Sequence, residues 1–150
     1  MAVYLADEQT EVVDTEDLLD LARYVLRARR VPEDMEVALL LVDEATIAGL
    51  NETHLGKAGP TDVLAFPIDE PGETPPDITA VLGDVVLCPA VAAAQAPRFQ
   101  RTTHEELRLL TVHGLLHLLG MDHAVAAEER EMFALTDRLL DGHRREGRAR

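Results

Sequence analysis

The chain has 150 residues, 47% of them hydrophobic, and its formal net charge is −14. This length and apolar fraction fit one compact domain, residues 1–150, with its own core. The negative charge argues against broad, non-specific nucleic-acid binding, because phosphate contacts need lysine and arginine. We find no signal-peptide pattern at the N-terminus and no apolar run near the ~18 residues that a membrane span needs. We therefore expect a cytoplasmic protein that does not act at a membrane.

Strand-like and helix-like patterns alternate through the first half of the chain. Apolar residues at helical spacing, with arginines near the end, indicate an early helix that Pro32 ends. A continuous apolar run then indicates a central strand covered on both faces. In chain order we predict a strand at 2–5, a helix at 12–30, a strand at 36–42, a helix at 44–53, a loop at 56–60 and a strand at 61–66.

The second half reads as one more strand followed by helices. From Leu107 onward one helix is apolar nearly all round, which places it in the middle of the molecule. The single cysteine, Cys88, excludes an internal disulfide, and we expect it in the core. We predict an exposed acidic loop at 69–77, a strand at 81–87, a helix at 89–96, a helix from Thr102 or Thr103 to Gly120, a helix at 126–140 and a disordered basic tail at about 142–150.

Three histidines, His113, His117 and His123, stand at positions i, i+4 and i+10. The first two project from one face of a helix. Gly120 can adopt the left-handed conformation that reverses the chain and brings the third toward them. Three histidines with a fourth position open form the catalytic zinc arrangement, so we predict one zinc ion per chain.

Gly114 stands where metalloproteases with a similar histidine spacing carry a glutamate as general base. A peptidase would therefore lack the residue that activates water. Because glycine inside a helix costs about 1 kcal/mol relative to alanine, its presence suggests that substrate or another element approaches the backbone closely.

Three segments together resemble the bacterial YbeY family of metal-dependent endoribonucleases, which act as ribosomal RNA maturation factors. They are the loop and strand at 59–67, the strand at 82–87, and the segment from His113 to His123. The resemblance covers roughly residues 36–140. It implies an α+β fold, with a mostly parallel four-stranded mixed sheet, about five helices and a metal site at the end of a central helix.

The same resemblance implies a single-strand-specific endoribonuclease of ribosomal RNA maturation and ribosome biogenesis, with zinc held by His113, His117 and His123. Its partners would be ribosomal RNA, ribosomal particles, and ribosomal proteins or assembly factors. Three positions depart from the family pattern. Leu55 stands near Lys57 where many members have an arginine, Met121 replaces a common tyrosine, and Ala65 replaces a common serine.

We assign roles to further residues around the histidines. Asp122 is adjacent to the last of them and could orient a metal-binding histidine without itself contacting the metal. The alternative is that Asp122 is simply a turn residue. Lys57 is a candidate to hold phosphate, and Arg108 is either a second one or part of a solvated face. We expect His54 in the loop near the site, and His104 and His143 on the surface.

Two other functions stay open at this point. A metallopeptidase would need little beyond the metal site itself. A ribosome-binding module without catalytic activity would use the zinc as a structural ion. In the nuclease hypothesis, the metal acidifies a water and polarises the phosphodiester, so that no carboxylate base is required.

Overall fold

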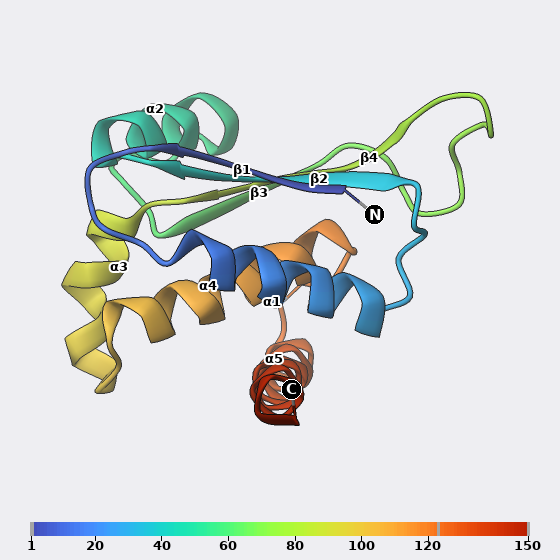
Figure 1. Ribbon diagram of the computed structural model, residues 1–150. Helices are drawn as coiled ribbons and strands as arrows, with labels where there is room; N and C mark the ends of the chain where they lie inside the picture. The colour runs from blue at the N-terminus through green and yellow to red at the C-terminus, as the bar shows by residue number, and fades with distance from the viewer. Residues whose placement is uncertain (1, 123, 150) are drawn as a thin grey trace.

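The structure is a computed structural model that describes residues 2–122 and 124–149, and in it helices cover both faces of one sheet (Figure 1). The strands are β1 (Ala2–Glu8), β2 (Met35–Val42), β3 (Val63–Pro67) and β4 (Ala80–Leu87). The helices are α1 (Thr15–Ala28), α2 (Glu44–Leu55), α3 (Pro89–Gln95), the short 3₁₀ helix η1 (Ala96–Phe99), α4 (Thr103–Leu118) and α5 (Ala126–Ala149).

The sheet has the order β1-β2-β4-β3. β2 pairs in parallel with both β1 and β4, whereas β3 pairs antiparallel with β4. The two central strands are the apolar runs, as expected for strands that are covered on both faces. The α+β fold and the mostly parallel mixed sheet implied by the family resemblance are therefore confirmed.

The two faces of the sheet carry cores of different size. The larger core joins one face to α1, α4 and α5. On the opposite face, α2 covers a smaller cluster that includes Ile47 and Cys88 (Figure 1). Burial raises the pKa of the Cys88 thiol, so this cysteine is an unreactive core residue, as predicted.

α4 is the central helix, and its position depends on Gly114. A capping box stabilises the N-terminus of the helix. The Thr102 hydroxyl accepts a hydrogen bond from the Glu105 backbone N–H, and the Glu105 carboxylate accepts one from the Thr102 N–H. Further along, a Cβ at Gly114 would lie 2.5 Å from Cγ1 of Val85 on β4. The glycine is therefore explained by close packing of another element against the helix backbone.

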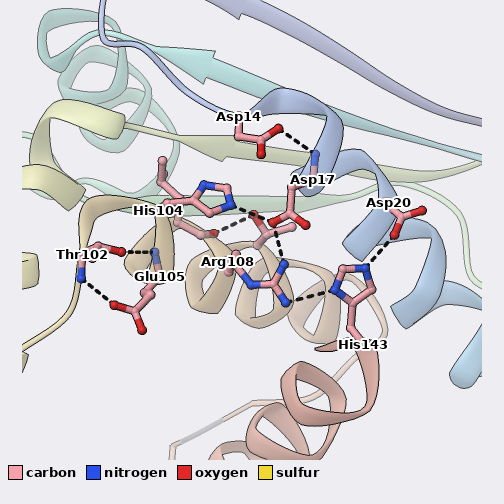
Figure 2. A network of polar contacts seen from close by, with 10 residues as sticks. Asp14, Asp17, Asp20, Thr102, His104, Glu105, Arg108 and His143 are labelled. Atoms are coloured by element: carbon pink, nitrogen blue, oxygen red, sulfur yellow. Dashed lines mark hydrogen bonds and ion pairs between the residues drawn. The ribbon is translucent and has the colours of Figure 1, made fainter. Parts of the chain in front are cut away.

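A chain of polar contacts joins α4 to α1 and α5 (Figure 2). The Arg108 guanidinium donates to Asp17 at 2.6 Å and lies 3.0 Å from Nδ1 of His143. His143 in turn lies 2.7 Å from Asp20, and His104 lies 2.7 Å from Asp17. We call Asp17, Asp20, His104, Arg108 and His143 the interhelical network.

This network corrects three predictions made from the sequence. Arg108 is buried and paired, so it neither holds phosphate nor belongs to a solvated face. His143 is also buried, and His104 is only partly exposed. The expected disordered tail at about 142–150 is helical as far as Ala149, because the burial of His143 extends the last helix past Leu140.

The loop between β3 and β4 projects beyond the end of the sheet and is mostly exposed (Figure 1). Its first residues still follow the hairpin, since the backbone N–H groups of Ile68 and Asp69 donate to Leu82 and Val81. In the part of the chain that is described, no helix has the length and apolar character needed to cross a membrane.

The contact at Gly114 predicts that Gly114→Ala lowers the free energy of unfolding by about 1–3 kcal/mol, because the added methyl group overpacks the interface with Val85. The matched control is Gly49→Ala in α2, where a Cβ meets no atom within 4 Å. That change should raise the stability by up to about 1 kcal/mol through helix propensity. Urea unfolding of both variants measures the difference, and an equally stabilising Gly114→Ala would contradict the contact.

The interhelical network predicts a pH-dependent stability. Burial alone would raise the pKa of Asp17, but hydrogen bonds from Arg108 and His104 outweigh it and lower the pKa. Because the folded pKa lies below the unfolded one, the stabilisation is complete above the unfolded value of about 3.9 and is lost as the pH falls through the folded value.

Asp17→Asn should therefore lower the free energy of unfolding at pH 7 by about 1–3 kcal/mol, less than for a fully buried pair because Asp17 is partly exposed. The gap between the unmodified chain and the variant should shrink below about pH 4. Urea unfolding across pH 3 to 8 tests this, with Glu16→Gln on the exposed side of the same helix as control. A difference in unfolding free energy that does not change with pH would argue against an ionised Asp17–Arg108 pair.

Candidate functional site

The C-terminal half of α4 forms one wall of a cavity of about 690 Å³. His113 and His117 line this cavity, and both are half-buried. They lie one helical turn apart, which directs both imidazoles to the same side of α4. Gly114 lies between them on the wall, with its own backbone held against β4.

The turn after α4 closes one end of this cavity. Gly120 has a φ of +92°, and its N–H donates to the carbonyl of His117. The predicted left-handed glycine is therefore confirmed, although the helix itself ends at Leu118. Met121 and Asp122 follow on the cavity wall. His123, the third predicted ligand, lies outside the described residues.

Another part of the cavity wall comes from the end of α2 and the loop that follows it. Lys57 is exposed and lines the cavity beside Leu55. The loop is held in place by Asn51, a buried residue whose amide donates to the carbonyl of Gly59 at 3.1 Å. Lys57 is the chain's single lysine, and no arginine is found among the described residues that line the cavity.

Asp62 lies just before β3, where the wall passes from the loop to the sheet. Its carboxylate accepts hydrogen bonds from the Val63 N–H and from the Gln95 amide, both at 2.8 Å. The backbone N–H of Cys88 donates to the Asp62 carbonyl at 3.0 Å. Asp62 therefore ties the start of β3 to β4 and α3 next to the histidines.

The donor set suits a metal that prefers nitrogen ligands. Neutral imidazoles at i and i+4 on one helix face are zinc ligands in many proteins, and a cavity of this size leaves room for a substrate group. Within residues 2–122 and 124–149, no group of three metal-binding side chains is present. The predicted three-histidine set cannot be completed there, since one of its members falls outside these ranges.

The structure brings together four of the five predicted site residues, His113, His117, Lys57 and Asp122, on the wall of one cavity. His54 does not join them. It lies in the last turn of α2 rather than in the loop, and its ring packs 5.1 Å from the ring of Phe66. The two departures from the family pattern at Ala65 and Met121 also lie on the cavity wall.

Sequence reasoning missed Asn51 and Asp62. Asn51 sits in a helix where its apolar neighbours show no strong periodicity, so nothing marks it as buried. Asp62 is a polar residue directly before a strand, a position at which acids are common in turns. Its partners Gln95 and Cys88 follow far along the chain, and only the folded arrangement brings them next to it.

Comparisons with known proteins identify the family of the chain. The family model described as Endoribonuclease YbeY matches residues 4–144. Proteins named Endoribonuclease YbeY from Acidothermus cellulolyticus and Thermobifida fusca are 54% and 48% identical to the chain. The alignments cover 99% and 97% of this chain and 94% and 96% of those relatives.

A solved structure supports the fold independently. The solution structure of a protein from Thermotoga maritima superposes with a TM-score of 0.64 at 28% identity, covering 98% of this chain and 92% of that one. The family match covers β1 from Tyr4 onward, all of β2, β3 and β4, and α1 to α4, and it includes every described residue of the cavity wall. The chain belongs to the Endoribonuclease YbeY family.

Proposed function

We propose that this chain is a zinc-dependent endoribonuclease that cleaves single-stranded RNA in the course of ribosomal RNA maturation. Family membership supports an RNA phosphodiester as the substrate. The observation that carries the proposal is that His113, His117 and Lys57 line a single cavity. The proposed ligands are these two histidines and His123.

The proposed chemistry assigns separate tasks to the chain and to the ion. When bound, zinc supplies Lewis acidity at a phosphoryl oxygen and lowers the pKa of its water toward ~7. His113 and His117 would hold it, and their helix is packed against β4 at Gly114, which lies between them in the sequence. Asp122 lies on the same wall and, in this proposal, orients a ligand imidazole.

Lys57 is proposed to hold a phosphate of the strand. Its ammonium is a mobile point charge on an exposed loop, and Leu55 beside it supplies no second cation. Because the Asn51 amide holds the loop through the Gly59 carbonyl, the lysine stem starts from a defined place on the cavity wall. The strand would then lie between Lys57 and α4.

The whole-molecule charge restricts how RNA reaches this cavity. With a net charge of −14, the chain repels a polyanion over most of its surface. Naked RNA should therefore bind weakly. In the ribosomal context, docking to neighbouring proteins would present one strand at high effective concentration, so low intrinsic affinity would matter less.

A peptidase is less well supported. Gly114 has no side chain to act as a base, and Val85 and Val63 fill the space next to it. Casein cleavage by zinc-loaded protein, abolished by His113→Ala, would show that the assigned class is wrong.

The first prediction of the proposed function concerns the metal. The purified chain should contain about one zinc per molecule, and His117→Ala should lose it because a site with one of three ligands removed is inadequate. RNA cleavage should be lost in the same variant. His54→Ala is the matched control, since His54 lies outside the cavity wall and should leave both properties unchanged. Elemental analysis measures the zinc content of both variants. Full zinc occupancy in His117→Ala would refute the ligand assignment.

The second prediction concerns Lys57. Lys57→Ala should reduce kcat/KM on RNA about tenfold, because a charge-assisted hydrogen bond to phosphate is lost. Lys57→Arg should retain most of the activity, and Arg98→Ala in η1, away from the cavity, should have little effect. The assay is a cleavage time course at several salt concentrations. Equal losses for Lys57→Ala and Arg98→Ala would mean that only net charge matters.

The third prediction concerns the substrate's context. Free ribosomal RNA should be cut slowly and at many positions, whereas ribosomal particles should be cut faster and at restricted positions, both activities being lost in His113→Ala. A side-by-side time course at matched salt measures this. Equal rates and equal cut sites on both substrates would refute the docking argument, and no cleavage of either would favour the non-catalytic ribosome-binding module.

A further inference from the structure

A second cavity, of about 510 Å³, adjoins the first and shares His113 with it. Its walls come from η1, α4 and α5, and it shares Asp62, Leu110 and His113 with the first cavity. We call it the aromatic pocket, after Phe99 and Phe133 on its wall. Any group bound there would lie directly beside the proposed site of cleavage.

Two aromatic rings of the pocket are unusually open to solvent. Phe99 is 58% exposed and Phe133 is 46% exposed. The Phe133 ring lies 5.3 Å from the His113 ring, and the Arg101 guanidinium lies 5.1 Å from the centre of the Phe99 ring. Exposed aromatic rings next to a nucleic-acid site offer stacking surfaces for bases, and every base has a π-face.

Glu106, on the same wall, is buried with one carboxylate oxygen unsatisfied. The residue is 2% exposed, and its Oε1 contacts Arg101 at a long 3.3 Å. Among the described residues, no hydrogen-bond donor reaches the other oxygen, Oε2. A buried acceptor left in this state is costly, and an N–H from a ligand would satisfy it. Arg101 itself is about one-third exposed.

The charges of the pocket indicate which part of an RNA strand fits. Three carboxylates line it, those of Asp62, Glu106 and Asp137. Arg101 is the one lysine or arginine on the described wall. This balance repels phosphate but accepts an uncharged group that carries N–H donors. A base satisfies that condition, and its sugar and phosphate would point toward the first cavity.

We propose that the aromatic pocket binds one nucleobase of the RNA substrate and selects bases that carry an exocyclic amino group over uracil. Phe99 and Phe133 stack on the base, and the Glu106 carboxylate accepts its amino N–H. This inference rests on the proposed function, in which the selected base would lie next to the scissile phosphodiester. Cytosine and uracil give the sharpest comparison, because their rings are equal in size and cytosine has an amino group where uracil has a carbonyl.

The test measures binding separately from cleavage. The probes are the nucleoside 5′-monophosphates CMP and UMP, which carry the same phosphate and contain no phosphodiester to cut. Dissociation constants come from NMR titration of the intact protein. CMP should bind at least about fivefold more tightly than UMP, since a hydrogen bond to a charged acceptor replaces a carbonyl–carboxylate repulsion.

Glu106→Gln should remove this preference, because a neutral amide can donate to the uracil carbonyl as well as accept from cytosine. Glu105→Gln is the matched control, since its side chain caps α4 outside the pocket and glutamine keeps the capping box. Phe133→Ala should weaken both nucleotides by about tenfold through lost stacking. This exposed position also keeps the test valid if Glu106→Gln fails to fold.

Equal affinities for CMP and UMP in the unmodified protein would overturn the inference, as would a preference that survives in Glu106→Gln. The inference would also be overturned if neither nucleotide bound but N-acetyl-lysine amide did. That result would assign the pocket to a lysine of a partner protein. Cleavage of RNA is scored independently. A protein that prefers CMP but cuts no RNA would refute the proposed function and leave the base selection standing.

Discussion

The close contact between the backbone of α4 and β4 is the constraint on which the rest of the site depends. Gly114 allows the helix to approach Val85 because it has no Cβ, and any side chain at that position would push the helix away from the sheet. His113 and His117 lie on the two sides of this contact along the helix. A shift of α4 would therefore move both imidazoles relative to the wall that carries Lys57.

The opposite side of α4 is held by the interhelical network. Arg108 bonds to Asp17 on α1 and contacts His143 on α5, so three helices are joined by buried or half-buried polar side chains (Figure 2). Such contacts specify one arrangement, because a buried charge left without its partner is costly. α4 is thus fixed by apolar packing on its sheet side and by polar pairing on its helix side. α5, held by this pairing, also supplies Phe133 to the pocket beside His113.

The features that were predictable from the sequence are those set by local periodicity. The spacing of His113 and His117 on a helix, the left-handed Gly120 and the apolar central strands all follow from the geometry of one element. The network was not predictable, because Asp17 and Arg108 are 91 residues apart and helical periodicity does not say which polar residue is buried. The length of α5 was underestimated for the same reason, since the burial of His143 depends on α1.

The proposed function depends on one metal ion bound by three imidazoles, those of His113, His117 and His123. X-ray absorption spectroscopy of the zinc-loaded protein tests this directly, because it counts histidine ligands without depending on activity. We predict nitrogen and oxygen neighbours at about 2.0–2.1 Å with the multiple scattering of three imidazole rings. In His117→Ala, both the number of imidazole ligands and the zinc occupancy should fall. A spectrum with two or fewer imidazoles in the unmodified protein would contradict the claim.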